Sequence, residues 1–157
     1  MYKEEIHIRQ LDWQPDELQQ LLEIENMSFN RFDAYNLEDF ERWYQYNPDL
    51  CLVAEIEGRI AGYMITRILP TQGDLASLAI HSNYKRHGLA TALFNYTVKR
   101  VKEYGKKQIT LEVRKNNSSA LAFWHKMGFV PFGSHPGFYE DGEEAILMRK
   151  WIDNSRP

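Results

Sequence analysis

Between residues 77 and 128 the chain alternates strand-like and helix-like segments, and this order constrains the fold more than any other feature. An apolar run over residues 77–80 leads into the basic glycine turn Lys85-Arg86-His87-Gly88, and residues 89–104 then carry apolar side chains at helical spacing. A second strand-like run at 108–113 precedes an asparagine turn and a helix over 118–127. Two strand–turn–helix units in succession predict a mixed α/β fold.

The rest of the chain extends this pattern. Residues 5–11 alternate as a strand does, and helices are predicted from Pro15 onward and over residues 36–44. Residues 50–56 and 60–69 flank a hairpin turn, a strand runs from 74 to about 80, and two last strands are expected near 129–133 and 144–150. The predicted order is β-α-α-β-β-β-α-β-α-β-β, with about seven strands and about four helices in a single domain over residues 1–157.

Composition fits a folded domain with a real core. The chain has 157 residues, of which 43% are hydrophobic. Its one cysteine, Cys51, lies in an apolar run and is expected to be a buried thiol in a reducing compartment. The charged first residues and the lack of an apolar run of ~20 residues predict a cytoplasmic protein without a signal peptide or membrane span.

Charge is distributed unevenly along the chain. Residues 1–60 hold 14 acidic and five basic side chains, a net charge of −9, whereas residues 84–107 hold seven basic and one acidic, a net charge of +6. The basic block includes the glycine turn and suits a phosphate-bearing ligand, although its helix lysines are also explained as a solvated surface. The acidic half would attract a cationic amine or a basic protein.

The glycine turn is suited to anion binding. Glycine at the start of a helix lets the backbone approach a ligand closely, and the first N–H groups of the helix point outward at the positive end of its dipole. Lys85, Arg86 and His87 add positive or potentially positive charge just before Gly88. The sequence therefore predicts a phosphate site at this turn.

Two motifs in this region resemble the GNAT superfamily of N-acetyltransferases. The superfamily signature is Gln/Arg-x-x-Gly-x-Gly/Ala after a strand, and here Lys85, Gly88 and Ala90 take its first, fourth and sixth positions. Residues 111–129 resemble the superfamily's strand followed by Asn-x-x-Ala-x-x-Phe-Tyr/Trp-x-x-x-Gly-Phe, with Asn117 and Trp124 in register. Residues 137–148 resemble the ending of protein N-terminal acetyltransferases, and the bacterial ribosomal-protein alanine acetyltransferases are the nearest named group.

The resemblance implies a fold and a co-substrate. In this superfamily the sheet splays between the fourth and fifth strands, residues 74–80 and 108–113 here, and admits the pantetheine arm of acetyl-CoA. Backbone groups of the fourth strand would hold the pantetheine and acetyl oxygen, the glycine turn would cradle the pyrophosphate, and Asn117 would contact the pantetheine as well as, or instead of, capping its helix. The implied cofactor-binding residues are Leu78, Ala79, Ile80, Lys85, Arg86, His87, Gly88, Leu89, Ala90, Thr91, Asn117, Ala120 and Trp124, and no metal is expected.

Acetyl transfer to an amine first needs a base, because a protonated amine has no lone pair. At pH 7 an α-amine of pKa ~8 is roughly a tenth neutral, whereas a lysine of pKa ~10.4 is neutral at well under about 0.1%. Strand alternation places Glu112 on the opposite face from Leu111 and Val113. The resemblance makes Glu112 the general base, and the alternative is an exposed glutamate paired across the sheet. Asp74 is a second carboxylate that could reach the amine directly or through water, or serve only the turn after Gly73.

The chain departs from its resembled relatives at the general acid. Twelve residues after the glutamate they carry a tyrosine, whereas this chain carries Trp124, whose indole cannot deliver a proton to a thiolate. The acid is therefore missing, replaced or unnecessary, since a thiolate whose conjugate acid has a pKa of ~8.5 is a tolerable leaving group. Tyr139 is the candidate replacement, and an aromatic wall for the substrate is its alternative role.

Acceptor identity is less constrained. The helical pair borders the acceptor groove in the resembled family, so Phe29 and Tyr35 are candidate contacts, and Glu25 either offers a carboxylate to a cationic acceptor or lies on a solvated helix face. A protein N-terminus is the first candidate acceptor and a small amine, such as a polyamine, amino acid or aminoglycoside-like compound, the second. A non-catalytic acetyl-CoA-binding module is a third function. Neither a nucleic-acid nor a membrane partner is expected, and the protein is expected to be a monomer or homodimer.

Overall fold

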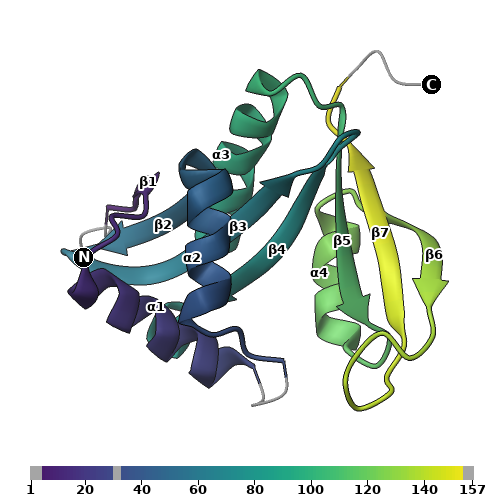
Figure 1. Ribbon diagram of the computed structural model, residues 1–157, viewed down its shortest axis with the longest axis horizontal. Coiled ribbons are helices and arrows are strands. Elements are labelled where there is room, and N and C mark those ends of the chain that lie inside the picture. The colour runs from purple at the N-terminus through teal and green to yellow at the C-terminus, as the bar shows by residue number, and fades with distance from the viewer. Residues whose placement is uncertain (1–4, 30–32, 154–157) are drawn as a thin grey trace.

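The computed structural model describes residues 5–29 and 33–153 and confirms the predicted order of elements (Figure 1). The four helices in these ranges are α1 (Pro15–Ser28), α2 (Leu37–Tyr46), α3 (Leu89–Glu103) and α4 (Ser118–Lys126), and the two short 3-10 turns are η1 (Pro48–Leu50) and η2 (Ser82–Tyr84). The strands are β1 (His7–Gln10), β2 (Cys51–Ile56), β3 (Arg59–Ile68), β4 (Gly73–Ile80), β5 (Gln108–Arg114), β6 (Val130–His135) and β7 (Ala145–Trp151).

The strands form one seven-stranded sheet in the order β1-β2-β3-β4-β5-β7-β6. Every neighbouring pair is antiparallel except β4 and β5, which are parallel and pair only at Gly73 with Ile109 and at Asp74 with Thr110. Beyond these positions the two strands separate, as Figure 1 shows below their point of contact. The predicted splay between the fourth and fifth strands is confirmed.

The helices cover the two faces of the sheet separately. On one face α1 and α2 pack against β3, with Leu21, Phe40 and Tyr63 among the most buried side chains. On the other face α3 and α4 enclose a second core that contains Phe94 and Trp124. Because the sheet opens between β4 and β5, these two layers are not fully separated there.

Local sequence explains where the helices around the opening begin. Helix α2 starts with a capping box, in which the Asn36 side chain accepts from the Asp39 N–H at 3.1 Å and the Asp39 carboxylate accepts from the Asn36 N–H at 2.9 Å. Helix α3 starts after Gly88, whose φ of 77° lies in the left-handed region that glycine adopts without cost. The chain thus turns into α3 at the position that the motif predicts.

The structure also describes the single cysteine and the lengths of the helices. Cys51 is buried, and burial raises the pKa of its thiol to about 12, so it stays protonated at neutral pH as a structural thiol. Across residues 5–29 and 33–153, no helix is both long and apolar enough to cross a membrane.

Candidate active site

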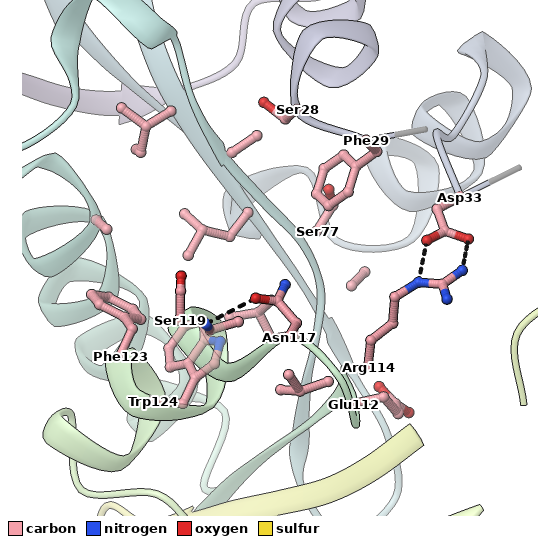
Figure 2. A pocket seen from close by; sticks show the side chains of 18 of the residues that line it. Ser28, Phe29, Asp33, Ser77, Glu112, Arg114, Asn117, Ser119, Phe123 and Trp124 are labelled. Atoms are coloured by element: carbon pink, nitrogen blue, oxygen red, sulfur yellow. Dashed lines mark hydrogen bonds and ion pairs between the residues drawn. The ribbon is translucent and has the colours of Figure 1, made fainter. Parts of the chain in front are cut away.

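A cavity of about 1040 Å³ lies where β4 and β5 separate and takes its walls from both faces of the sheet. In Figure 2 side chains from α4 lie on one side of it, and Phe29, Asp33 and Arg114 lie on the other. The wall on the α3/α4 face is formed by Tyr84, Lys85, Arg86, Gly88, Leu89, Ala90, Thr91, Asn117, Ser119, Ala120, Phe123, Trp124 and Lys126. The wall on the α1/α2 face includes Ser28, Phe29, Asp33, Tyr35, Asp39, Arg42, Trp43, Arg67 and Ser77. A molecule on one face can therefore reach a molecule on the other through the gap in the sheet.

The N-terminus of α3 gives the α3/α4 half of the cavity a geometry that suits an anion. The first backbone hydrogen bond of the helix runs from the Ala92 N–H to the Gly88 carbonyl at 3.0 Å. The N–H groups of the residues before Ala92 therefore point out of the helix end. Arg86 also takes a positive φ, 68°, which is unusual for a residue with a side chain. Lys85 and Arg86 line the cavity beside this helix end, and Lys126 adds a cation from α4 that the sequence had not singled out. His87 is exposed and is not part of the cavity wall.

Strand β4 and helix α4 form the middle of the cavity, as their sequence motifs predict. Leu78, Ala79 and Ile80 line it along β4. The Asn117 side chain accepts from the Ala120 N–H at 3.1 Å, which confirms its cap, and it also lies in the cavity wall (Figure 2), where ligand contact stays a prediction. Trp124 lines the cavity but is only 6% exposed, because it packs edge-on against Phe94, Phe123 and Phe129.

Glu112 lies in the cavity wall on the α1/α2 face of β5. Leu111 and Val113 pack into the core beneath α3 and α4, so alternation directs Glu112 to the opposite face. Burial and, to a lesser extent, the charge of the neighbouring Asp74 carboxylate raise its pKa to about 7, against the opposing effect of Arg67. A carboxylate that titrates near neutral pH is suited to accept a proton from an amine.

Asp74 does not have the position expected of a base. It is only 3% exposed and is absent from the cavity wall. One carboxylate oxygen accepts from the Thr110 hydroxyl at 2.8 Å, and the other pairs with Arg67. With both oxygens engaged, Asp74 is not placed to reach an amine directly. Its role in this geometry is to fasten β4 to β5 and to raise the pKa of Glu112.

Glu25 lies in neither of the two positions that the sequence analysis considered. Its side chain is fully buried, so it neither lines the cavity nor lies on a solvated face. The carboxylate accepts from the Tyr63 hydroxyl, from the Ser77 hydroxyl at 3.1 Å and from the Tyr35 N–H at 3.0 Å. The sequence left open acceptor contact or a solvated helix face for Glu25, but the backbone at Tyr35 and the side chains of Tyr63 and Ser77 enclose its carboxylate. Glu25 thus holds the cavity wall in place from behind.

The half of the cavity on the α1/α2 face has aromatic walls. Phe29 and Tyr35 line it as expected, and Tyr35 packs edge-on against Trp43 with ring centroids 4.7 Å apart. Phe138 and Tyr139 enter from the segment between β6 and β7. Burial raises the pKa of Tyr139 to about 12, with an opposing effect from the Arg114 guanidinium above its ring. Tyr139 is therefore a protonated hydrogen-bond donor at neutral pH.

Sequence reasoning missed several residues of the cavity wall. Arg67, Ser77 and Arg114 all line it, yet none had been singled out. For Arg114 a signal was available, since strand alternation places it on the same face as Glu112, two residues away. For Arg67 and Ser77 the deciding information is the pairing of β3 with β4, which one strand's pattern does not contain. Among the described residues, no group of His, Cys, Asp or Glu is arranged to hold a metal ion.

Comparison with known proteins agrees with this geometry. The model of the acetyltransferase (GNAT) family matches residues 18–129, which is more than half of the chain. The chain belongs to this family. Among curated relatives, an N-alpha-acetyltransferase of Sulfurisphaera tokodaii is 38% identical over 109 residues, 61% of this chain and 65% of that protein. The ribosomal protein bS18-alanine N-acetyltransferase of Escherichia coli is 31% identical over 94 residues, 58% of this chain and 64% of that protein.

These two matches span just under two thirds of each relative's length. Among solved structures, a chain of the NatC complex, crystallised with Gag peptide and CoA, superposes with a TM-score of 0.83 at 19% identity. That likeness covers 95% of this chain and 99% of the other, and it supports the family's fold. The predicted mixed α/β fold and the resemblance to GNAT acetyltransferases are both confirmed.

The anion site at α3 is tested by substituting its glycine. We expect Gly88→Glu to abolish the rise in melting temperature that acetyl-CoA produces by mass action in the unaltered protein, because a carboxylate then faces the phosphates. Gly105→Glu is a matched control, since both glycines have a φ of 77° and a Cβ at either position meets no atom within 4 Å. Differential scanning fluorimetry with millimolar acetyl-CoA measures both. A full shift in Gly88→Glu would contradict the assignment of this turn.

Proposed function

We propose that the protein transfers the acetyl group of acetyl-CoA to the α-amine at the N-terminus of a protein. Acetyl-CoA lies with its phosphates at the N-terminus of α3 and its pantetheine arm along β4 and Asn117, and its thioester reaches into the gap between β4 and β5. The acceptor enters from the α1/α2 face. Family membership and the cavity open to both faces support this arrangement. A cytoplasmic location stays a prediction from the sequence.

The observation that carries the proposal is the position of Glu112 at the gap together with its pKa of about 7. Proton transfer from an α-ammonium of pKa ~8 to this carboxylate is unfavourable by only about one pKa unit, or ~1.4 kcal/mol. Transfer from a lysine ammonium of pKa ~10.4 is unfavourable by about three units, or ~4–5 kcal/mol. The base therefore favours an α-amine over a lysine side chain.

The remaining step is direct attack of the neutral amine on the thioester carbonyl. The nitrogen–carbon bond forms, the carbon–sulfur bond breaks with its electron pair on sulfur, and CoA leaves as a thiolate while the second proton of the nitrogen passes to water. A phenol of pKa about 12 is a poor proton donor to a thiolate whose conjugate acid has a pKa of ~8.5. Tyr139 is thus suited to hydrogen-bond the acceptor, and buried Trp124 to pack beside the cofactor.

The acceptor class is tested by a screen that measures released CoA. Peptides with varied first residues, the same peptides with a blocked α-amine and an internal lysine, and small amines are compared at equal concentration. We expect peptides with a free α-amine to be acetylated at least about tenfold faster than the blocked ones, because Glu112 is matched to the α-amine. Preferential acetylation of polyamines or free amino acids would instead favour a small-molecule acceptor.

The pH dependence separates the roles of the two carboxylates. We expect kcat/KM to rise with pH through about 7, where Glu112 loses its proton and becomes a base. In Glu112→Gln this rise in the pH profile should be absent. The kcat should fall about 10²–10⁴-fold, with little change in acetyl-CoA affinity. Asp74→Asn should keep the rise but shift it to lower pH, because a neighbouring negative charge is removed. Loss of the rise in Asp74→Asn alone would return the role of base to Asp74.

The need for a general acid is tested at Trp124 and Tyr139. We expect Trp124→Phe to keep most activity and Trp124→Tyr to gain little, because the thiolate leaves without a strong acid. Tyr139→Phe should lower kcat by less than about tenfold, since it removes a hydrogen bond rather than a proton donor. Steady-state kinetics with an α-amine peptide measures all three. A large gain in Trp124→Tyr would show instead that proton delivery limits turnover.

A further inference from the structure

Arg114 is held between two carboxylates at the edge of the cavity. Its Nε and Nη2 donate to the two carboxylate oxygens of Asp33 at 2.6 and 2.8 Å, the bidentate pair drawn in Figure 2. Its Nη1 donates to both oxygens of Asp141, at 3.0 and 3.2 Å. The arginine side chain is only 16% exposed. All three nitrogens of the guanidinium are therefore engaged, in the planar geometry that only arginine provides.

The two partners come from segments that are far apart in sequence. Asp33 precedes α2, and Asp141 lies in the segment between β6 and β7, 108 positions later. Both carboxylates meet on one residue of β5, two positions beyond Glu112. Arg114 thus connects the segment before α2, which belongs to one wall of the cavity, to the segment between β6 and β7, which belongs to the other.

The segment that Asp141 anchors is itself well ordered by hydrogen bonds. The Asp141 carboxylate accepts from the Glu143 N–H at 3.1 Å, and the Tyr139 N–H donates to the Glu143 carbonyl at 3.2 Å. The Arg114 guanidinium lies 4.2 Å from the centre of the Tyr139 ring. A displacement of Arg114 would therefore move Tyr139, which lines the acceptor half of the cavity.

From this geometry we infer that Arg114 is a positioning residue that sets the acceptor site by holding its two walls at a fixed separation. The inference rests on the proposed function, since it assigns the α1/α2 half of the cavity to the acceptor. It predicts that Arg114 governs the use of the acceptor and leaves acetyl-CoA binding alone, because the phosphate site at α3 lies on the other face of the sheet.

Arg9 is a matched control elsewhere in the molecule. Its guanidinium also joins two carboxylates, with Nη2 at 2.6 Å from Glu17 and Nε at 2.7 Å from Glu55. It ties β1 to α1 and β2 and is not part of the cavity wall. Arg9→Gln removes an arginine that also joins two carboxylates. It therefore measures the structural effect of losing such an arginine away from the cavity.

The first experiment is steady-state kinetics with an α-amine peptide found in the acceptor screen. We expect Arg114→Lys and Arg114→Gln to lower kcat/KM for the peptide at least about tenfold, with KM for acetyl-CoA within about twofold. Arg114→Lys keeps the positive charge but cannot bridge both aspartates. If activity with the peptide is lost in Arg114→Lys as well, the bridging geometry of the guanidinium, and not its charge, is what the acceptor site needs. Arg9→Gln should change both parameters by less than about twofold. Equal losses for peptide and acetyl-CoA, or no loss for either, would overturn the inference.

The second experiment needs no acceptor and so separates this inference from the proposed function. Hydrogen–deuterium exchange with acetyl-CoA bound should be faster at residues 33–36 and 138–144 in Arg114→Gln than in Arg9→Gln, with α3 unchanged in both. If no acceptor were acetylated, this result would still support the clamp while the proposed function failed. Unchanged exchange at both segments would overturn the clamp itself. Faster exchange with unaltered peptide kinetics would overturn its role in acceptor binding.

Discussion

The two-residue contact between β4 and β5 determines the shape of the cavity. Only Gly73 and Asp74 pair across this junction, and Asp74 strengthens it through Thr110 on β5 and Arg67 on β3. Fastened at one end, the two parallel strands diverge toward the other and open the sheet. The opening joins the half of the cavity beside the N-terminus of α3 to an aromatic half on the other face of the sheet.

The same junction determines the chemistry of the opening. Asp74 is buried and charged close to Glu112, and this repulsion adds to burial in raising the Glu112 pKa to about 7. One carboxylate is thus engaged in structural contacts, and the other has a pKa suited to the base that we propose. Asp141 and the buried Glu25 lie outside the cavity and support its wall on the α1/α2 face, whereas Asp33 holds Arg114 from within that wall.

The elements and most of the cavity lining on the α3/α4 face could be predicted from sequence because both depend on local pattern. Periodicity located every strand and α-helix of residues 5–29 and 33–153, and Gly88 and Asn117 mark the starts of two helices. The half on the α1/α2 face could be predicted only in part, because it depends on contacts between distant segments. Glu25 was expected either at the acceptor or on a solvated helix face, yet Tyr35 and Ser77 enclose it. Asp74 was a second candidate for the amine or a turn residue, yet its oxygens are engaged by Thr110 and Arg67.

We propose that the co-substrate and the acceptor approach from opposite faces of the sheet and meet beside Glu112. The decisive measurement is a crystal structure with CoA linked through an acetyl group to the α-nitrogen of a peptide. We expect the CoA phosphates at the start of α3, the peptide between Tyr35 and Tyr139, and the linked nitrogen within reach of Glu112, directly or through one water. Both halves of the ligand on one face, or a nitrogen remote from Glu112, would contradict it.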